Sequence, residues 1–200
     1  MSFSSTTKTP VGVSCPGFPV EQVETAIDEL ERTRGTHKGL RYEDILHLPD
    51  VTLLGVTSAT PDRLEAAHAA CTEHIEFGCV RLITGAPFQR VEDYCEWICT
   101  ELYKHVPTSH VLIFQWDGYV KNWRAWSNDW LQYDYIGAPW GFPDGHNVGN
   151  GGFSLRSRRL MEIVATDPAI KRHHPEDRRI CRDYRPHLEQ VHGIRFAPED

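Results

Sequence analysis

Several features that define large protein classes are missing from this 200-residue sequence. None of the six cysteines forms a C-x-x-C pair, which argues against a zinc ribbon or a thioredoxin-like site. No apolar run approaches the roughly 18 residues of a membrane-spanning helix, and the first residues do not resemble a secretory signal. We therefore expect a protein of the cytoplasm, or of a host cytoplasm if the gene is viral, with buried free thiols and no membrane span.

Binding motifs for common phosphate-containing cofactors are missing as well. The turn after the first predicted strand, residues 57–61, reads Thr-Ser-Ala-Thr-Pro, so it lacks the glycines of a dinucleotide fingerprint or a P-loop. Excess positive charge is also missing, because the net charge is −7, and this argues mildly against a nucleic-acid partner. The arginines that could still form a local basic face are Arg156, Arg158, Arg159, Arg178 and Arg179.

The sequence does contain a regular alternation of apolar strands and amphipathic helices. Val51–Thr57 is an almost continuous apolar run, which is typical of a strand buried on both faces. After Thr60 and Pro61, which suit a helix start, apolar residues recur at helical spacing until Gly78. The same reasoning predicts strands over 51–57, 79–83, 111–114 and 194–197, and helices over 60–78, 91–102, 158–165 and 176–191.

This order of elements predicts a single α/β domain with a Rossmann-like, mostly parallel central sheet flanked by helices. We place the domain at residues 42–200. Residues 1–41 are rich in Ser, Thr, Pro and Gly with little periodicity, so we expect an N-terminal arm, with a short helix over 20–32.

Asp117 follows the third predicted strand directly. In open parallel sheets, ligands bind beyond the carboxyl ends of the strands, so we expect its carboxylate to face a cleft. A carboxylate there suits Mg²⁺ or Mn²⁺, which complete their ligand shell with phosphate and water. The alternative is that Asp117 and Gly118 only form a turn.

Three segments stand out, of which the last two are long and unusual: Gln115-Trp-Asp-Gly118, Tyr133-Asp-Tyr-Ile-Gly-Ala-Pro-Trp140 and Val148-Gly-Asn-Gly-Gly-Phe-Ser-Leu-Arg-Ser157. Together they resemble a family of small glycosyltransferase-like proteins with a compact GT-A-like fold, and the resemblance covers residues 42–198. It implies transfer of a hexose from a nucleotide-diphosphate sugar, a UDP-sugar first of all, to an acceptor hydroxyl. Inversion and retention both stay open.

The resemblance also implies a donor site for the nucleotide sugar. The first strand–helix turn would line the nucleotide pocket. Asp117 would bind Mn²⁺ or Mg²⁺ as the last acid of the Asp-x-Asp motif of GT-A enzymes. Gln115 stands where that motif has its first acid, which lowers the expected metal affinity and leaves a metal-independent reaction open. The donor-site candidates are Thr57, Ser58, Arg81, Tyr94, Gln115, Trp116 and Asp117.

The sugar and acceptor candidates follow from the glycine-rich segment. Its bare backbone N–H groups permit close approach to a sugar, and a tryptophan offers a flat face to a pyranose. These candidates are Trp140, Asn150, Gly151 and Gly152. Asp177 is the preferred candidate for the base that deprotonates the acceptor, with Glu176 as the alternative. Both acids would also suit the first turn of a helix without any catalytic role.

Histidines and tryptophans supply weaker signals. His173-His174 and the pair His187 and His192 have suggestive spacings, but neither matches a zinc motif, so we expect no zinc site. His146 and His192 are candidates for a further ligand to a catalytic ion. The tryptophan-rich stretch 116–140 is a candidate cover for the site.

Three functions compete at this point. The first is a glycosyltransferase acting on a glycan or small molecule. The second is a DNA glycosyltransferase of the phage type, acting on a hydroxymethylated base. The third is a non-catalytic module that binds a sugar nucleotide or carbohydrate.

Overall fold

The computed structural model describes residues 44–171 and 174–199. The expected arm over residues 1–41 and its helix lie outside this part of the chain. The strands are β1 (Leu46–Thr57), β2 (Ile75–Thr84), β3 (His110–Phe114), β4 (Tyr135–Gly137) and β5 (Ser154–Ser157). The helices are α2 (Pro61–Thr72), α3 (Val91–Thr100), α4 (Arg158–Thr166), α5 (Glu176–Arg178) and α6 (Arg185–His192). Short 3₁₀ helices are η2 (Leu102–His105), η3 (Trp123–Ala125) and η4 (Asn128–Gln132), and η5 (Arg179–Asp183) is a π-helical turn.

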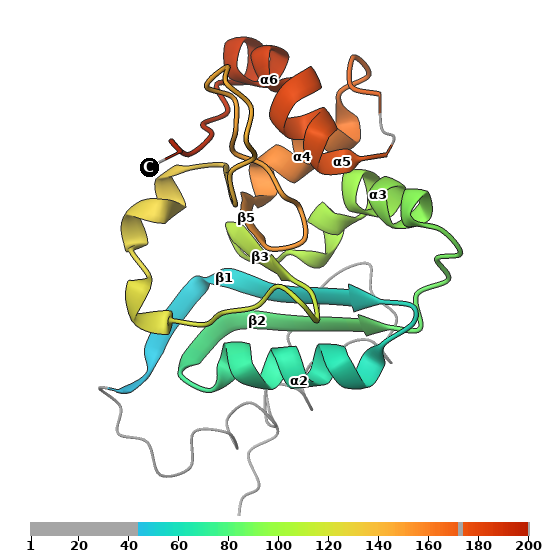
Figure 1. Ribbon diagram of the computed structural model, residues 1–200. Helices are drawn as coiled ribbons and strands as arrows, with labels where there is room; N and C mark the ends of the chain where they lie inside the picture. The colour runs from blue at the N-terminus through green and yellow to red at the C-terminus, as the bar shows by residue number, and fades with distance from the viewer. Residues whose placement is uncertain (1–43, 172–173, 200) are drawn as a thin grey trace, which may run out of the picture.

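The strands form one open sheet in the order β2-β1-β3-β5-β4. β1 runs parallel to β2 and β3, whereas β5 runs antiparallel to both β3 and β4. The fold is therefore α/β with a mixed sheet flanked by helices, as Figure 1 shows. The expectation of a mostly parallel sheet is not confirmed, because the second half of the chain adds its two strands through antiparallel pairings instead of helical crossovers.

Helices cover both faces of the sheet because the buried strands are apolar on both sides. On one face, Leu53 and Phe114 pack against α2 through Leu64. On the other face, Leu54 and Ile113 belong to a larger core formed with α3, α4 and α6 (Figure 1). In this three-layer arrangement, the carboxyl ends of β1 and β3 lie between the N-termini of helices.

The second strand begins earlier than the pattern predicts. α2 ends at Thr72, and Ile75, assigned above to that helix, instead opens β2 opposite Leu46. Gly78 lies within the strand, where a Cβ would sit only 2.0 Å from the Pro49 carbonyl oxygen. The glycine permits this close approach of two backbones and does not end a helix.

The C-terminal part departs further from the predicted elements. The single helix expected over 176–191 is divided into α5, the turn η5 and α6, and α6 ends at Gly193 with φ 63°. The strand expected over 194–197 is reduced to one bridge between Phe196 and Tyr135. β4 and β5 were not expected, because strands of three and four residues leave little periodicity in a sequence.

Two expectations drawn from composition can also be compared with the structure. The five cysteines in the described part of the chain are buried free thiols, as expected: Cys71, Cys79, Cys95, Cys99 and Cys181. None of the helices formed by residues 44–171 and 174–199 has the length and apolar character needed to cross a bilayer.

Candidate functional site

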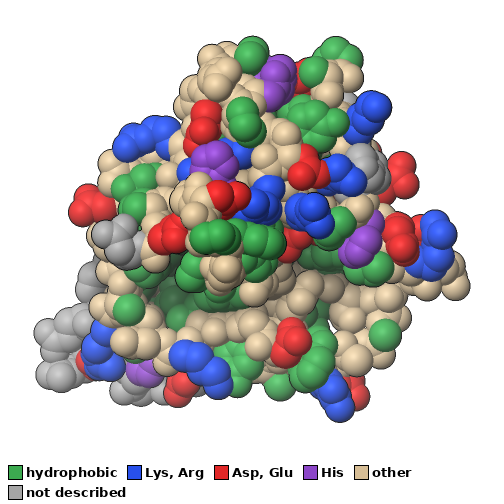
Figure 2. Space-filling view, turned by 45° about the horizontal axis from the view of Figure 1, so that its top comes forward, with side chains coloured by type: hydrophobic (Ala, Val, Ile, Leu, Met, Phe, Trp, Pro, Cys, Tyr) green, Lys and Arg blue, Asp and Glu red, His purple; other side chains and the backbone are tan. Residues whose placement is uncertain are grey.

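A cleft of about 560 Å³ opens at the carboxyl ends of β1 and β3. We call it the sheet-end cleft. Its walls are the turn after β1, the segment that begins α3, and the two residues that follow β3. Five of the expected donor-site residues line it: Thr57, Ser58, Tyr94, Gln115 and Trp116. Figure 2 shows a hollow across one face of the molecule, with hydrophobic side chains in its floor and charged side chains above it.

The surroundings of the sheet-end cleft favour an anionic ligand. The N-termini of two helices, α2 at Pro61 and α3 at Val91, adjoin the cleft and carry the partial positive charge of helix starts. Arg90 also lines the cleft, and its guanidinium is paired with Asp93 at 3.4 Å. The turn itself is ordered by the Thr57 hydroxyl, which accepts hydrogen bonds from the N–H groups of Ala59 and Thr60 at 3.2 and 3.1 Å.

Trp116 supplies a flat aromatic surface at the edge of this cleft. The residue is 47% exposed, which is unusual for so large an apolar side chain. The Arg63 guanidinium lies 4.9 Å from its ring centre. An exposed ring held by one cation suits stacking with a planar ligand group such as a nucleobase.

A buried ion pair lies below the cleft. Arg156 on β5 is 0% exposed and donates to Glu176 Oε1 at 3.1 Å. Burial alone would lower the pKa of Arg156, but its neighbours, including Glu176, raise it overall, so the guanidinium stays charged. The thiol of Cys95 donates to the other carboxylate oxygen, Oε2, at 3.2 Å. Burial, followed by the charge of Glu176, raises the pKa of Cys95 to about 12, so this sulfur is a hydrogen-bond donor and not a nucleophile.

Tyr94 connects this ion pair to the cleft. Burial raises the pKa of Tyr94 above its usual value, and the charge of Glu176 raises it further, so the phenol stays protonated. The Gln115 side chain lies within hydrogen-bonding reach of the Tyr94 hydroxyl. Its Oε1 faces Gly152, where an added Cβ would lie 2.8 Å away. Gln115 is thereby held between Tyr94 and the glycine-rich segment.

The glycine loop, residues Gly149–Gly152, is fixed by close contacts. Gly151 donates its N–H to Asp177 Oδ2 at 3.0 Å and its carbonyl oxygen accepts from Arg156 at 3.2 Å. A Cβ on Gly149 would meet the Trp140 ring at 2.2 Å. Asn150 has φ 55°, a left-handed conformation that Asn tolerates better than most residues. The sequence needs small residues here because backbone and side chains approach so closely.

A second cleft, of about 430 Å³, lies on the other side of this loop. We call it the Trp140 cleft, and its lining includes Trp140, Phe142, Asp177 and Arg182. Of the residues expected for acceptor binding and for the catalytic base, Trp140 and Asp177 line this cleft, whereas Asn150, Gly151 and Gly152 do not. The glycine loop joins the two clefts, because Gly152 contacts a lining residue of one and Gly151 a lining residue of the other.

Asp177 and Glu176 differ in their surroundings although they are adjacent. Asp177 is half-buried and lines the Trp140 cleft, with Oδ1 accepting from the Arg178 N–H at 2.7 Å. Glu176 is only 5% exposed and its two oxygens are taken by Arg156 and Cys95. Of the two, only Asp177 borders a cleft, so it is the better placed to contact a ligand.

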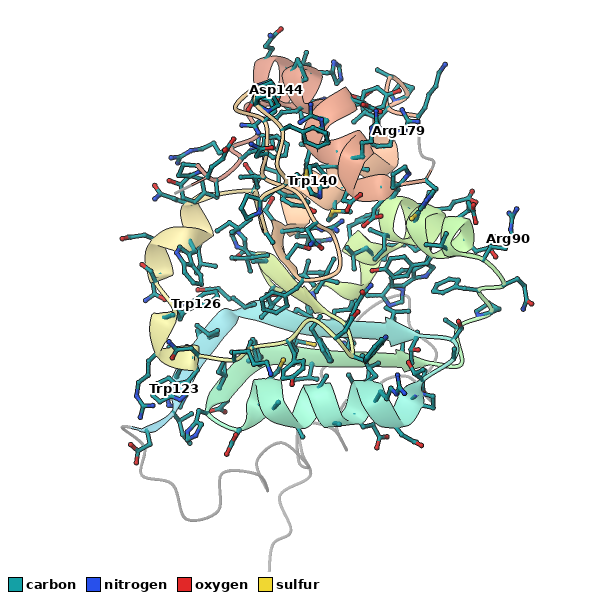
Figure 3. All side chains as sticks on the ribbon, viewed as in Figure 1. Arg90, Trp123, Trp126, Trp140, Asp144 and Arg179 are labelled. Atoms are coloured by element: carbon teal, nitrogen blue, oxygen red, sulfur yellow. The ribbon has the colours of Figure 1, made fainter. Side chains whose placement is uncertain are left out.

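Some predicted residues lie elsewhere. Asp117 is exposed at the tip of a turn closed by hydrogen bonds between Gln115 and Gly118, and it lines neither cleft. Arg81 lies on β2 beside Leu54 of β1, outside both linings. Figure 3 shows Trp123 and Trp126 at the opposite end of the sheet from Arg90, so these two tryptophans do not cover the sheet-end cleft.

Other site residues were missed from sequence. Arg156 was assigned to a basic surface, but the structure buries it, since β5 pairs on both edges and directs this side chain into the core. From the sequence, Cys95 is expected only to be a buried thiol. The residues around Arg90 form no motif that would mark it as a site residue.

The fit of a divalent ion to the sheet-end cleft depends on Asp117. Asp117 is exposed and lies outside the lining of that cleft, and no other carboxylate of the described residues lines it, so the residues there do not fit a divalent ion, which needs oxygen ligands. Within residues 44–171 and 174–199, one group of three His, Cys, Asp or Glu side chains has its ligand atoms close enough to share an ion: Asp167, His187 and His192. These three residues line neither cleft.

These features define an α/β protein with an open mixed sheet and a ligand-sized cleft at the carboxyl ends of its parallel strands, where proteins of this class bind ligands. The chain belongs to the family described as "Protein of unknown function (DUF5672)", whose model matches residues 76–192. The match covers more than half of the chain and runs from β2 to the end of α6. Searches of curated proteins and of solved structures found no match.

Proposed function

We propose that this protein is a glycosyltransferase that uses a nucleotide-diphosphate sugar. The observation that carries the proposal is the glycine loop with a cleft on either side. A transferase needs two ligands whose reacting atoms meet at one place. The sheet-end cleft would take the donor and the Trp140 cleft the acceptor.

The donor assignment follows from charge and shape. Two helix N-termini favour the diphosphate, and Trp116 offers a stacking surface to the base. In transfer, the bond between the anomeric carbon and the β-phosphate oxygen breaks, and the nucleoside diphosphate leaves with the electron pair. The two helix N-termini at the cleft would stabilise that charge.

Asp177 would act as base at the acceptor. Its carboxylate accepts the proton of the acceptor hydroxyl while that oxygen forms a bond to the anomeric carbon. Backbone N–H groups of Gly151 and Arg178 fix its orientation. Glu176 would be a positioning residue that anchors the loop through Arg156.

The acceptor is more consistent with a glycan or small molecule than with DNA. Arg156, one of the five arginines considered for a basic face, is buried, and Arg179 is paired with Asp183. The aromatic pair Trp140 and Phe142 in the second cleft suits the C–H face of a sugar ring. Turnover that requires DNA and falls steeply with salt would favour the DNA acceptor instead.

The test separates binding from turnover. Purified protein is titrated with UDP and GDP, and a panel of UDP- and GDP-sugars is assayed for diphosphate release with Mn²⁺, with Mg²⁺ and with EDTA. We expect Trp116→Ala to weaken nucleotide binding about tenfold, consistent with loss of one stacking contact. Trp130→Ala, an exposed tryptophan outside both clefts, is the matched control.

Variants of two acids complete the test. Asp177→Asn should abolish turnover and leave nucleotide binding intact, and Asp117→Asn should leave turnover unchanged with metal and with EDTA, because Asp117 lines neither cleft. Asp129→Asn, at an exposed acid on η4, controls for loss of surface charge. Nucleotide binding without turnover of any donor would favour a non-catalytic binding module. Absence of binding to every nucleotide sugar would refute the proposal.

A further inference from the structure

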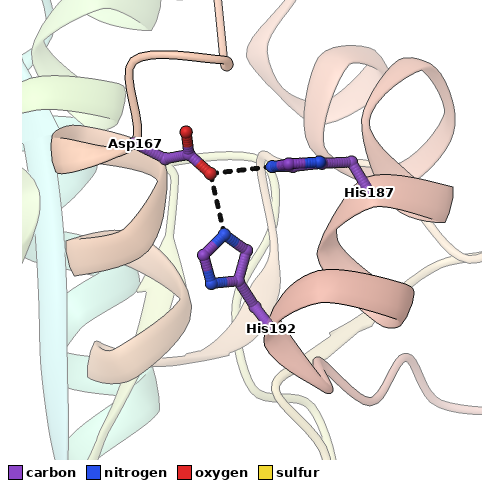
Figure 4. A group of neighbouring side chains, drawn as sticks. All are labelled: Asp167, His187 and His192. Atoms are coloured by element: carbon purple, nitrogen blue, oxygen red, sulfur yellow. Dashed lines mark hydrogen bonds and ion pairs between the residues drawn. The ribbon is translucent and has the colours of Figure 1, made fainter.

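Three side chains converge at the C-terminal end of α4, far from the glycine loop in sequence. Asp167 follows α4 directly, and His187 and His192 lie on α6. The Nε2 atoms of both histidines lie 2.7 Å from the same oxygen, Asp167 Oδ2 (Figure 4). The two imidazole rings are 5.3 Å apart between centres.

The local backbone aims these groups at one point. Asp167 Oδ1 accepts the N–H of Ala169 at 2.8 Å, so the other oxygen, Oδ2, turns toward the histidines. His187 and His192 are five residues apart and belong to the same helix, whose end reverses at Gly193. Figure 4 shows both rings pointing at the aspartate from one side of α6.

We propose that Asp167, His187 and His192 form a binding site for Zn²⁺. The ligands would be Nε2 of each histidine and Oδ2 of the aspartate, and these atoms already lie within 4.8 Å of one another. Ligand atoms bound at about 2.0–2.1 Å to a tetrahedral zinc ion lie about 3.3 Å apart. Each N–O separation therefore needs to widen by only about 0.6 Å, starting from 2.7 Å.

Exposure permits both this adjustment and entry of the ion. The side chains of His187 and His192 are 31% and 26% exposed, and that of Asp167 is 13% exposed. Three protein ligands leave the fourth tetrahedral position to water. Two imidazoles with one carboxylate favour zinc over Mg²⁺ or Ca²⁺, which prefer oxygen ligands throughout.

The site is separate from the proposed active site. None of its three residues lines the sheet-end cleft or the Trp140 cleft. Zinc bound here would join the end of α4 to α6, two elements of the same helical layer. The expectation of no zinc site was based on spacing alone, and the third ligand, 20 residues before His187, was outside any recognisable motif.

The experiment measures metal binding directly and does not depend on turnover. The full chain, purified without a histidine tag, is titrated with Zn²⁺ against a competing chelating dye. Co²⁺ is then substituted to report geometry by its visible absorption. We expect one ion per chain, a tetrahedral Co²⁺ spectrum and a higher melting temperature with Zn²⁺.

Conservative variants distinguish a metal site from a polar cluster. His187→Gln and His192→Gln each keep an amide N–H that can reach Asp167, so the fold should persist, as circular dichroism would verify. Each should weaken Zn²⁺ binding at least about tenfold, because loss of even an outer partner of a metal ligand has that effect. His146→Gln, away from the trio, should bind as the unaltered chain does. Zinc binding that is absent, or equal in all variants, would overturn the proposal.

Discussion

Removing the charge of Glu176 tests how the site is supported. Glu176→Gln keeps the shape of the side chain but leaves Arg156 as an uncompensated charge that is 0% exposed. At 3.1 Å and an effective dielectric constant of about 20, the lost attraction amounts to about 5 kcal/mol. Breaking buried pairs by removing one partner costs about 3–5 kcal/mol. We therefore expect the free energy of unfolding to fall by about 3–5 kcal/mol.

The assay is urea unfolding followed by circular dichroism and tryptophan fluorescence. Glu101→Gln is the matched control, since Glu101 pairs with Lys104 at 2.9 Å on the surface and both side chains are more than 40% exposed. Its loss should stay within about 0.5 kcal/mol. A double-mutant cycle with Arg156→Met should give a coupling energy of about 2 kcal/mol or more. Equal losses in Glu176→Gln and the control, or a coupling near zero, would refute the reasoning.

Three further predictions concern single positions. Gly137→Ala should lower the free energy of unfolding by more than about 2 kcal/mol, because its Cβ would lie 1.7 Å from a carbonyl oxygen of the glycine loop. Gly141→Ala, which has open space around its Cβ, should be nearly neutral in the same urea assay. Asn150→Gly should keep the stability and the loop conformation, while Asn150→Val should cost about 1–2 kcal/mol at this left-handed position; comparable stability of the two variants would contradict that conformation. Burial lowers the pKa of His110 despite a backbone hydrogen bond that raises it. On acidification, the unfolded chain therefore takes up this proton before the folded chain does. The stability that the neutral His110 contributes is present above about pH 6.5 and is lost as the pH falls toward the folded pKa. His110→Gln should therefore flatten the decline in melting temperature between about pH 7 and pH 5, and His146→Gln, at a partly exposed histidine, should leave that decline unchanged.

The first half of the fold could be predicted because its elements are long and strongly patterned. Residues 51–57 of β1 and residues 111–114 of β3 are almost continuous apolar runs, and α3 carries apolar residues at helical spacing. The nucleotide-site candidates in this half are implied by the family resemblance, and the topology agrees for those at strand ends, since the ends of neighbouring parallel strands lie together. Thr57, Tyr94 and Gln115 indeed line one cleft.

The second half could not be predicted in the same way because tertiary contacts determine it. β4 and β5 are too short to show alternation, and they exist because they pair with each other and with β3. The position of Asp117 depends on a two-residue turn, which rotates its side chain outward in a way that strand order cannot reveal. The burial of Arg156 depends on Glu176, 20 residues later, so neither residue indicates it alone.

The shared position of the glycine loop has a thermodynamic consequence. Gly151 and Gly152 contact lining residues of opposite clefts, so any displacement of the loop alters both clefts together. If occupation of the sheet-end cleft changes the affinity of the Trp140 cleft by some factor, occupation of the Trp140 cleft must change the affinity of the sheet-end cleft by the same factor. The order in which two ligands bind would then affect only the rates of binding and not its final extent. If both clefts bind a ligand, the glycine loop would therefore couple the occupancy of one cleft to that of the other.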